Sequence, residues 1–95
     1  MRDTMESKVA LVMGASSGIG RATALGFAER GAKVVIADVA VEGGEETVRM
    51  IEKAGGDALF VRTDVSEVRD VRAMVDKAVE AYGHSRVSIL ARRKG

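Results

Sequence analysis

Three short apolar runs are each followed by a segment with helical periodicity, and this alternation limits the possible folds more than any other feature of the sequence. The runs are KVALVM at 8–13, KVVIAD at 33–38 and ALFVR at 58–62. Nearly continuous Val-rich runs of this length are typical of strands buried on both faces of a parallel sheet. Strands that alternate with helices indicate crossover connections, so we predict an α/β fold.

The segments after these runs predict three helices. The first is expected over residues 19–30 and stops at Gly31, the second is closed by Gly55 and Gly56, and the third ends at Gly83 with Ser66 as its N-cap. Their buried faces follow from apolar residues at helical spacing: Ile19, Ala22, Thr23, Gly26 and Phe27 in the first; Val41, Val48 and Ile51 in the second; Val68, Val71, Val75, Ala78, Val79 and Tyr82 in the third.

The order of the strands follows from the handedness of the connections. Right-handed crossovers, with residues 87–90 as a fourth strand, give the order 3-2-1-4. This is a partial Rossmann fold, a doubly wound parallel sheet that is truncated. The first two helices then cover one face and the third helix covers the other alone. We expect much of that second face to be bare, which favours self-association or a homo-oligomer.

Composition limits the class of protein. Ninety-five residues with 46% hydrophobic and 31% charged content describe one domain, which we take as a single partial Rossmann domain over 1–95. The absence of cysteine fits a cytoplasmic location, and because residues 1–6 are partly acidic and lack a long apolar run, we expect neither a signal peptide nor a membrane segment there. A net charge of +1 and only three aromatic residues disfavour nucleic-acid binding.

A glycine-rich turn, Gly14-Ala15-Ser16-Ser17-Gly18-Ile19-Gly20, lies between the first strand and the first helix. Glycines allow a ligand to approach the backbone, and a helix N-terminus offers unpaired N–H groups and a partial positive charge to a phosphate. The Ser16 and Ser17 hydroxyls are further possible donors. The spacing G-x-x-x-G-x-G differs from the common G-x-G-x-x-G, and a tight structural turn is the alternative interpretation.

Two acidic residues end the next strands. Asp38 lies 18 residues beyond Gly20, close to the offset of about 20 at which an acid binds the ribose hydroxyls of NAD. A carboxylate there repels the additional phosphate of NADP, and Val39 follows in place of a basic residue. The alternative is that Asp38 caps the second helix. Asp64, at the end of the third strand, is either a ligand-binding or a turn residue.

Together these segments resemble the short-chain dehydrogenase/reductase family: GASSGIG after KVALVM, Asp38 after KVVIA, Asp64-Val65 after LFVR, and Ala81-Tyr82-Gly83 at a helix end. The resemblance covers about residues 8–83. It implies an oxidoreductase that uses a nicotinamide cofactor on alcohols or carbonyls, usually as a homo-oligomer. It also implies roles for individual residues: Gly14, Ser16, Gly18, Ile19 and Gly20 at the pyrophosphate, Asp38 at the ribose, and Asp64 and Val65 at the adenine.

The chain departs from the family pattern at two places. Met13 replaces the usual Thr before the first glycine, which removes a hydroxyl that tethers the turn. After the fourth strand, Ala91-Arg92-Arg93-Lys94-Gly95 replaces the usual Asn-Asn-Ala-Gly, and five residues rather than about three separate Gly83 from Ile89-Leu90. We interpret residues 84–95 as a divergent or frame-shifted tail, the alternatives being a foreign segment or a diverged fourth strand with a basic end.

The residues for hydride-transfer chemistry are missing from the sequence. The family uses Tyr-x-x-x-Lys with a Ser, and no Tyr-x-x-x-Lys occurs here. Tyr82, the only tyrosine, has Arg86 four residues later, but Gly83 is expected to end the helix between them. We expect Tyr82 to be a packed residue, and His84, the only histidine, to lie in a loop without a catalytic or metal site.

Three functions are compatible with the sequence. The first is an NAD(H)-binding N-terminal part of a dehydrogenase that is inactive by itself. The second is a separate nucleotide-binding or regulatory module, and the third is an interaction subunit that no longer binds the cofactor. The expected partner in the first two is NAD, preferred over NADP because of Asp38, and no metal is expected. The substrate cannot be predicted, because the residues of the chain give no sign of it.

Overall fold

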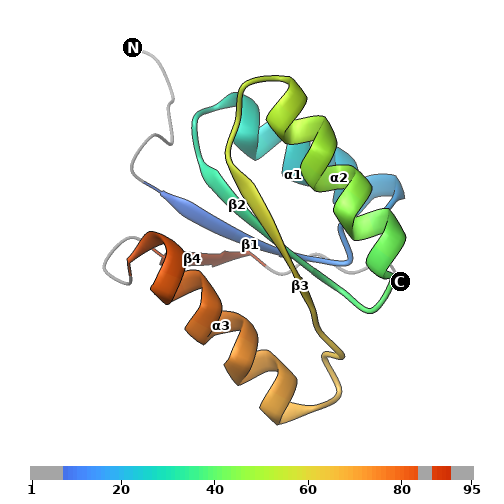
Figure 1. Cartoon of the computed structure of the whole chain (residues 1–95), viewed down its shortest axis with the longest axis vertical. Coiled ribbons are helices and arrows are strands. Elements are labelled where there is room, and N and C mark those ends of the chain that lie inside the picture. The colour runs from blue at the N-terminus through green and yellow to red at the C-terminus, as the bar shows by residue number, and fades with distance from the viewer. Residues whose placement is uncertain (1–7, 84–86, 91–95) are drawn as a thin grey trace.

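A computed structural model describes residues 8–83 and 87–90 (Figure 1). Four strands alternate with three helices along the chain. Their bounds are β1 (Val9–Met13), α1 (Gly18–Glu29), β2 (Lys33–Asp38), α2 (Val41–Lys53), β3 (Ala58–Arg62), α3 (Val68–Tyr82) and β4 (Val87–Leu90). The predicted α/β class is therefore confirmed, and the strands begin and end within one residue of the predicted positions.

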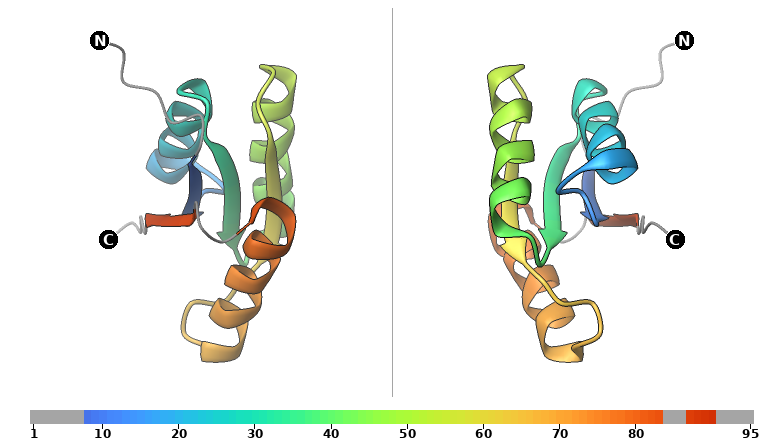
Figure 2. Two further views of the ribbon diagram at one scale, coloured as in Figure 1. Left: turned by 90° about the vertical axis from the view of Figure 1, so that its left-hand side faces the viewer. Right: turned by 90° about the vertical axis from the view of Figure 1, so that its right-hand side faces the viewer.

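The strands form one parallel sheet in the order β3-β2-β1-β4. Val12 pairs with Ile36 of β2 on one side and with Leu90 of β4 on the other, and Asp38 pairs with Arg62. Figure 2 shows the short β4 beside β1. The predicted order and the fourth strand are confirmed. Because the strands are parallel, their carboxyl ends lie at one edge of the sheet, where open α/β folds bind ligands.

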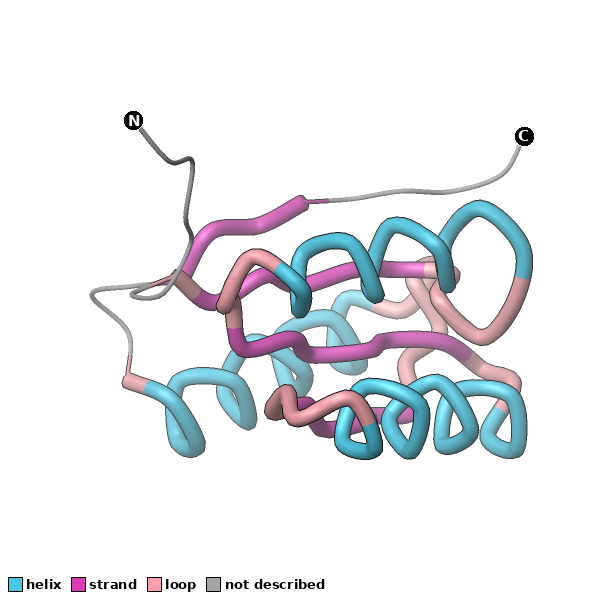
Figure 3. The backbone as a smooth tube through the Cα atoms, turned by 90° about the horizontal axis from the view of Figure 1, so that it is seen from above, coloured by secondary structure: helices cyan, strands magenta, loops and turns pink. Residues whose placement is uncertain are grey.

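The helices lie on both faces of the sheet, as predicted (Figures 1 and 3). α1 and α2 pack on one face, where Ala24, Ile51 and the partly buried Phe27 meet Val12 and Ile36. α3 packs on the other face, where Met74 and Ala78 meet Leu11 and Val35. Alternate residues of β1 and β2 therefore enter different cores, and this explains why both strands are apolar throughout.

The expectation of a bare second face is wrong for β1 and β2. Val9, Leu11, Val35 and Ala37, which face α3, are all at most 2% exposed. The reason is that α3 has 15 residues and contacts all four strands, so one helix covers the central strands. On β1 and β2, this face therefore lacks the exposed apolar surface on which the expectation of self-association was based.

The ends of the helices differ partly from prediction. Gly31, Gly55 and Gly83 follow α1, α2 and α3 with φ values of 98°, 94° and 85°, so glycine supplies the left-handed conformation after each helix. The N-cap of α3 is Glu67, not Ser66. Both the N–H and the hydroxyl of Ser66 donate to Asp64 Oδ1, and these bonds hold Ser66 in the preceding turn.

The first residue of each of the three predicted buried stripes is also exposed. Ile19 is 66%, Val41 41% and Val68 77% exposed, and Ala22 of the first stripe is exposed as well, whereas Gly20, Ala24 and Met74 are buried. Ile19, Val41 and Val68 stand in the first turn of a helix at the carboxyl edge of the sheet, beyond the strands on which the helices pack. No helix in residues 8–83 or 87–90 combines the length and the apolar character needed to cross a membrane.

Candidate functional site

Three loops meet at the carboxyl edge of the sheet. The glycine turn follows β1, Val39 and Ala40 follow β2, and residues 63–67 follow β3. The Gly14 N–H donates to the Ala37 carbonyl at 2.9 Å, and the Thr63 N–H donates to the Asp38 carbonyl at 3.0 Å. These bonds extend the sheet beyond its strands and hold the three loops side by side.

The glycine turn depends on backbone conformations and spaces that other residues cannot adopt. Gly14 and Gly18 have φ values of 76° and 61°, in the left-handed region. Gly20 lies directly against the start of the turn, because a Cβ at this position would overlap the Gly14 carbonyl oxygen. Three glycines at this spacing are therefore required for the chain to leave β1 and enter α1 within a few residues.

The N-terminus of α1 points out of this turn. The first backbone bond of α1 runs from the Arg21 N–H to the Ser17 carbonyl, so the N–H groups of Gly18, Ile19 and Gly20 precede it. Ser17 is the N-cap, but its side chain makes no capping bond, and the first turn contains no acidic residue. Unlike α2 and α3, α1 thus carries no carboxylate in its first turn that would compete with an anion.

Asp38 faces the glycine turn across the edge of the sheet. Its Oδ2 accepts the Ser16 hydroxyl at 2.6 Å and the Ser16 N–H at 3.3 Å, while its Oδ1 accepts the Ala40 N–H at 3.1 Å. Partial burial raises the pKa of Asp38, but these hydrogen bonds outweigh it, and the net pKa is lowered. The carboxylate is therefore charged at neutral pH, and the structure brings Asp38 and Ser16 together.

The turn is also held from the other side, by α2. The buried Thr47 hydroxyl lies 2.8 Å from the Ala15 carbonyl, to which it donates. Arg21 donates from Nε to Thr47 Oγ1 at 2.8 Å and from Nη2 to the Ser16 carbonyl at 2.6 Å and the Gly43 carbonyl at 3.1 Å. This network anchors two successive carbonyls of the turn, although Met13 offers no hydroxyl for that purpose.

Asp64 lies at the same edge but does not contact Asp38 through its side chain. Its Oδ1 accepts both bonds from Ser66, while its N–H donates to Asp70 Oδ2 at 3.0 Å. The bonds from the Ser66 hydroxyl and N–H lower the pKa of Asp64. The carboxylate thus stabilises the turn into α3, and the adjacent Val65 is 55% exposed.

Exposed apolar side chains gather at this edge. Ile19, Val39 and Val65 are each more than half exposed, and each follows the end of a different strand. Apolar surface left in water at one edge is a feature of sites that take a partly apolar ligand. The edge therefore combines helix N–H groups, a carboxylate and apolar side chains.

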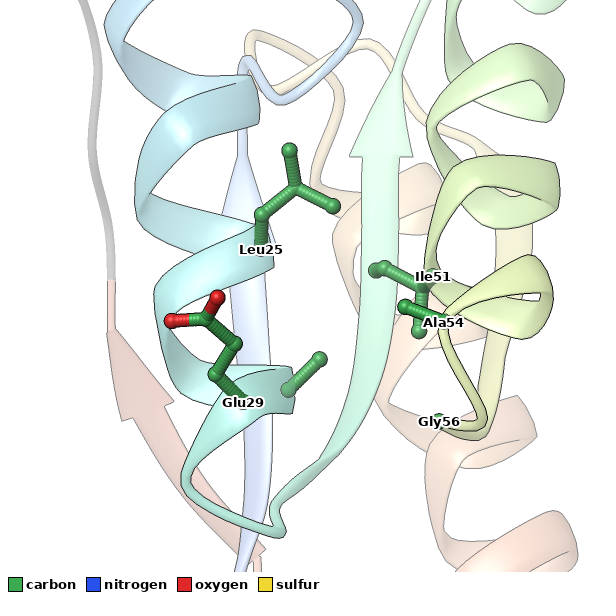
Figure 4. A pocket seen from close by; sticks show the side chains of 6 residues that line it. Leu25, Glu29, Ile51, Ala54 and Gly56 are labelled. Carbon is green, nitrogen blue, oxygen red and sulfur yellow. The ribbon is translucent and has the colours of Figure 1, made fainter.

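A small hollow lies elsewhere, between the C-terminal ends of α1 and α2 (Figure 4). Leu25, Glu29, Ile51, Ala54 and Gly56 are among its lining residues, and its volume is about 160 Å³. Because both helices end at the amino edge of the sheet, this hollow is far from the glycine turn. It is mostly apolar and smaller than sites that hold drug-sized ligands.

Tyr82 is placed as the sequence predicts, in the packing of α3. Its ring joins the α3 core, and its hydroxyl donates to Asp57 Oδ1 at 3.1 Å. Burial and the nearby Asp57 carboxylate raise the pKa of Tyr82 well above its ordinary value. Gly83 ends the helix after it, as expected, while His84 and Arg86 lie outside the described residues.

Sequence reasoning missed three residues of the site: Arg21, Gly43 and Thr47. Signals in the sequence pointed to the first two. A cation in the first turn of a helix opposes the helix dipole, and two glycines in the first turn of α2 weaken that helix. Both features destabilise the helix in which they occur, and this indicates that the residues make contacts with another part of the fold. Gly43 lets Ser16 approach α2, while Gly44 leaves room for the Phe60 ring.

Comparison with known proteins agrees with this geometry. A family model described as short chain dehydrogenase matches residues 8–92. An uncharacterized oxidoreductase of Thermotoga maritima is 47% identical over 90 residues, which cover 95% of this chain and 34% of that protein. A cis-4-hydroxycyclohexanecarboxylate dehydrogenase of Sinomonas cyclohexanicum is 49% identical over 83 residues, which cover 87% of this chain and 33% of that protein.

The fold has a solved counterpart. A crystal structure of hydroxysteroid dehydrogenase from Escherichia coli superposes with a TM-score of 0.82 at 32% identity, covering 84% of this chain and 34% of that one. The chain is thus an α/β protein of the doubly wound class. It belongs to the short-chain dehydrogenase family of oxidoreductases, and it spans about a third of the length of the relatives it matches.

Proposed function

We propose that this chain binds a nicotinamide dinucleotide at the carboxyl edge of its sheet, as the N-terminal cofactor-binding part of a family oxidoreductase. The observation that carries the proposal is the charged Asp38 carboxylate, fixed by Ser16 beside a glycine turn that opens into α1. In the family, such enzymes use this cofactor to oxidise alcohols or reduce carbonyls. The whole protein's activity is proposed on that basis.

The pyrophosphate is assigned to the glycine turn. Gly14, Gly18 and Gly20 allow close approach, the N–H groups of Gly18, Ile19 and Gly20 precede the first bond of α1, and the Ser17 hydroxyl is an additional donor. The Ser16 hydroxyl already donates to Asp38, so we assign Ser16 to the ribose end of the site. Asp64 and Val65 are assigned to the adenine, with Val39 providing further apolar surface.

NAD is the proposed cofactor in preference to NADP. Asp38 accepts hydrogen bonds, which suits the ribose hydroxyls, and its lowered pKa keeps it charged. Two like charges about 4 Å apart repel by about 1 kcal/mol in water and about 4 kcal/mol near a protein surface. A phosphate on the ribose next to Asp38 is therefore disfavoured at least about fivefold.

The chain is proposed to carry no hydride-transfer activity of its own. A general base at a reacting alcohol needs a pKa near the working pH, whereas the pKa of Tyr82 is raised and its hydroxyl is bonded to Asp57. Tyr82 also lies on α3, away from the glycine turn, in the core on the other face.

The cytoplasmic location and the frame-shifted tail both stay predictions, and the tail falls largely outside the described residues.

The test is a titration of the purified chain with NADH and NADPH, followed by calorimetry or cofactor fluorescence. We expect wild type to prefer NADH. Asp38→Ala and Asp38→Asn should weaken NADH binding about tenfold and remove the preference, because Ala removes both the acceptors and the charge, and Asn removes the charge and replaces one acceptor by a donor. Asp76→Asn, a change at an exposed position on α3, is the matched control.

Each outcome has a clear meaning. An unchanged NADH preference in both Asp38 variants would remove Asp38 from the cofactor site. Failure of wild type to bind either nucleotide would refute the proposal and favour an interaction subunit. Binding of NADH without oxidation of secondary alcohols by NAD would support a cofactor-binding part without catalysis.

A further inference from the structure

Arg21 occupies a position that is unfavourable for a cation. It stands in the first turn of α1, where the partial positive charge of the helix dipole disfavours basic residues. Its side chain is 23% exposed, and its ion pair with Glu46, at 3.5 Å, involves a carboxylate that is 57% exposed. Such an exposed ion pair contributes little, so it does not explain why the cation is placed here.

The shorter contacts of Arg21 are with the backbone. Its Nη2 donates to the Ser16 carbonyl at 2.6 Å and to the Gly43 carbonyl at 3.1 Å, and its Nε donates to Thr47 Oγ1 at 2.8 Å. One planar guanidinium thereby joins the glycine turn to two residues of α2. The fixed fork of an arginine suits this arrangement, whereas a lysine cannot reach the same three acceptors together.

The direction of a carbonyl sets the direction of the next N–H. In a trans peptide the Ser16 carbonyl and the Ser17 N–H lie in one plane and point in opposite directions. By holding the Ser16 carbonyl toward α2, Arg21 turns the Ser17 N–H away from α2. In the same way, Thr47 holds the Ala15 carbonyl, and the Ser16 N–H then points to Asp38.

Gly43 supports this arrangement independently. A Cβ at position 43 would lie 2.8 Å from the Ser16 carbonyl oxygen and 2.9 Å from Ser16 Cβ. A glycine inside a helix costs about 1 kcal/mol relative to alanine. The cost is explained by the close approach of Ser16 to α2, which the contacts of Arg21 require.

We propose that Arg21 is a positioning residue for the dinucleotide: it holds the Ser16 carbonyl against α2 and thereby aims the Ser17 N–H at the ligand. This inference rests on the proposed function and deepens it. Arg21 acts through the turn and does not itself bind the cofactor. Its role is thus distinct from a simple attraction between a cation and a phosphate.

The test compares Arg21→Lys and Arg21→Met with wild type in the full chain. NADH affinity is measured well below the unfolding temperature of each variant, so that loss of stability does not affect the result. We expect both variants to raise Kd about tenfold, with Met at least as harmful as Lys. Arg49→Lys, a change at an exposed position on α2, should leave Kd unchanged.

The lysine variant separates positioning from charge. If Arg21→Lys binds NADH like wild type, charge alone is sufficient and the proposal is overturned. Gly43→Ala provides a second variant that leaves Arg21 in place. Because its Cβ displaces Ser16 from α2, we expect it to weaken NADH binding as well, and unchanged binding would count against the proposal.

A measurement without cofactor keeps this test separate from that of the proposed function. Amide hydrogen exchange over residues 15–18 should become faster in Arg21→Lys than in Arg49→Lys, because the turn loses its anchor. Unchanged exchange would overturn the role of Arg21 even if wild type fails to bind NADH. Faster exchange with no NADH binding by wild type would refute the cofactor site and leave the anchoring of the turn established.

Discussion

Two glycines of α1 should respond to the same substitution in opposite directions. Gly20 and Gly26 both lie in this helix, and neither has a φ in the left-handed region. A Cβ at Gly26 meets nothing within 4 Å, whereas a Cβ at Gly20 overlaps the Gly14 carbonyl. Replacing each glycine by alanine therefore separates the effect of helix propensity from that of contact with the glycine turn.

The expected magnitudes follow from these contacts. Gly26→Ala gains the helix propensity of alanine, about 1 kcal/mol, with no steric cost. Gly20→Ala gains the same amount but must displace backbone, and overpacking of this kind costs about 3 kcal/mol. The net loss is about 2 kcal/mol. For a domain of this size, about 1 kcal/mol shifts Tm by about 4–8 °C.

Thermal unfolding followed by circular dichroism at 222 nm measures both effects. We expect Tm to rise by about 4–8 °C in Gly26→Ala and to fall by about twice that amount in Gly20→Ala. NADH binding should be kept by the first variant and strongly weakened by the second. A Gly20→Ala chain as stable as wild type would show that Gly20 does not lie against Gly14, and the described site would be incorrect.

Three further predictions concern the stability of the fold at low pH, the hydrogen bond of Tyr82 and self-association of the chain. Because folding lowers the pKa of Asp38, its carboxylate stabilises the folded state above about pH 4, and this stabilisation is lost as the pH falls through the folded pKa. The difference in unfolding free energy between wild type and Asp38→Asn should therefore become smaller when the pH is lowered from 7 to 3. Tyr82→Phe loses the bond to Asp57 and should lower the unfolding free energy by about 1 kcal/mol, measured by urea denaturation, without changing NADH affinity. β3 and β4 are the edge strands of the described sheet, and their unpaired edges should support self-association. Light scattering should then show an average mass that rises with protein concentration. A constant monomer mass would exclude self-association through these edges.

The strands were predictable because burial on both faces leaves a clear signal. KVVIAD is apolar almost without interruption, and its bounds as β2 are the predicted ones. The faces of the helices were less predictable. Ile19 and Val68 continue an apolar period into the first turn, yet packing stops at the end of the strands, and a periodic pattern does not indicate where the opposing sheet ends.

The site was predictable only in its main features. The glycines and Asp38 could be placed because each follows a strand, and parallel strands bring their ends to one edge. The bond between Ser16 and Asp38 could not be predicted, because it depends on side-chain geometry across 22 positions of sequence. The same holds for the bond between Arg21 and Thr47, which joins residues 26 positions apart.

The glycine turn is held by two supports of different chemical kind, and this division explains how the proposed cofactor site would hold an anion without a cation in direct contact. On one side Asp38 accepts from Ser16, and on the other Arg21 and Thr47 hold the carbonyls of Ser16 and Ala15. Carbonyl oxygens, which repel phosphate, are thus turned toward donors of the protein. Within the turn, the Gly14 and Ser16 N–H groups bond to Ala37 and Asp38, so the proposed donors to a dinucleotide are the N–H groups from Ser17 to Gly20. The orientation that a dinucleotide would need is thus set before it binds.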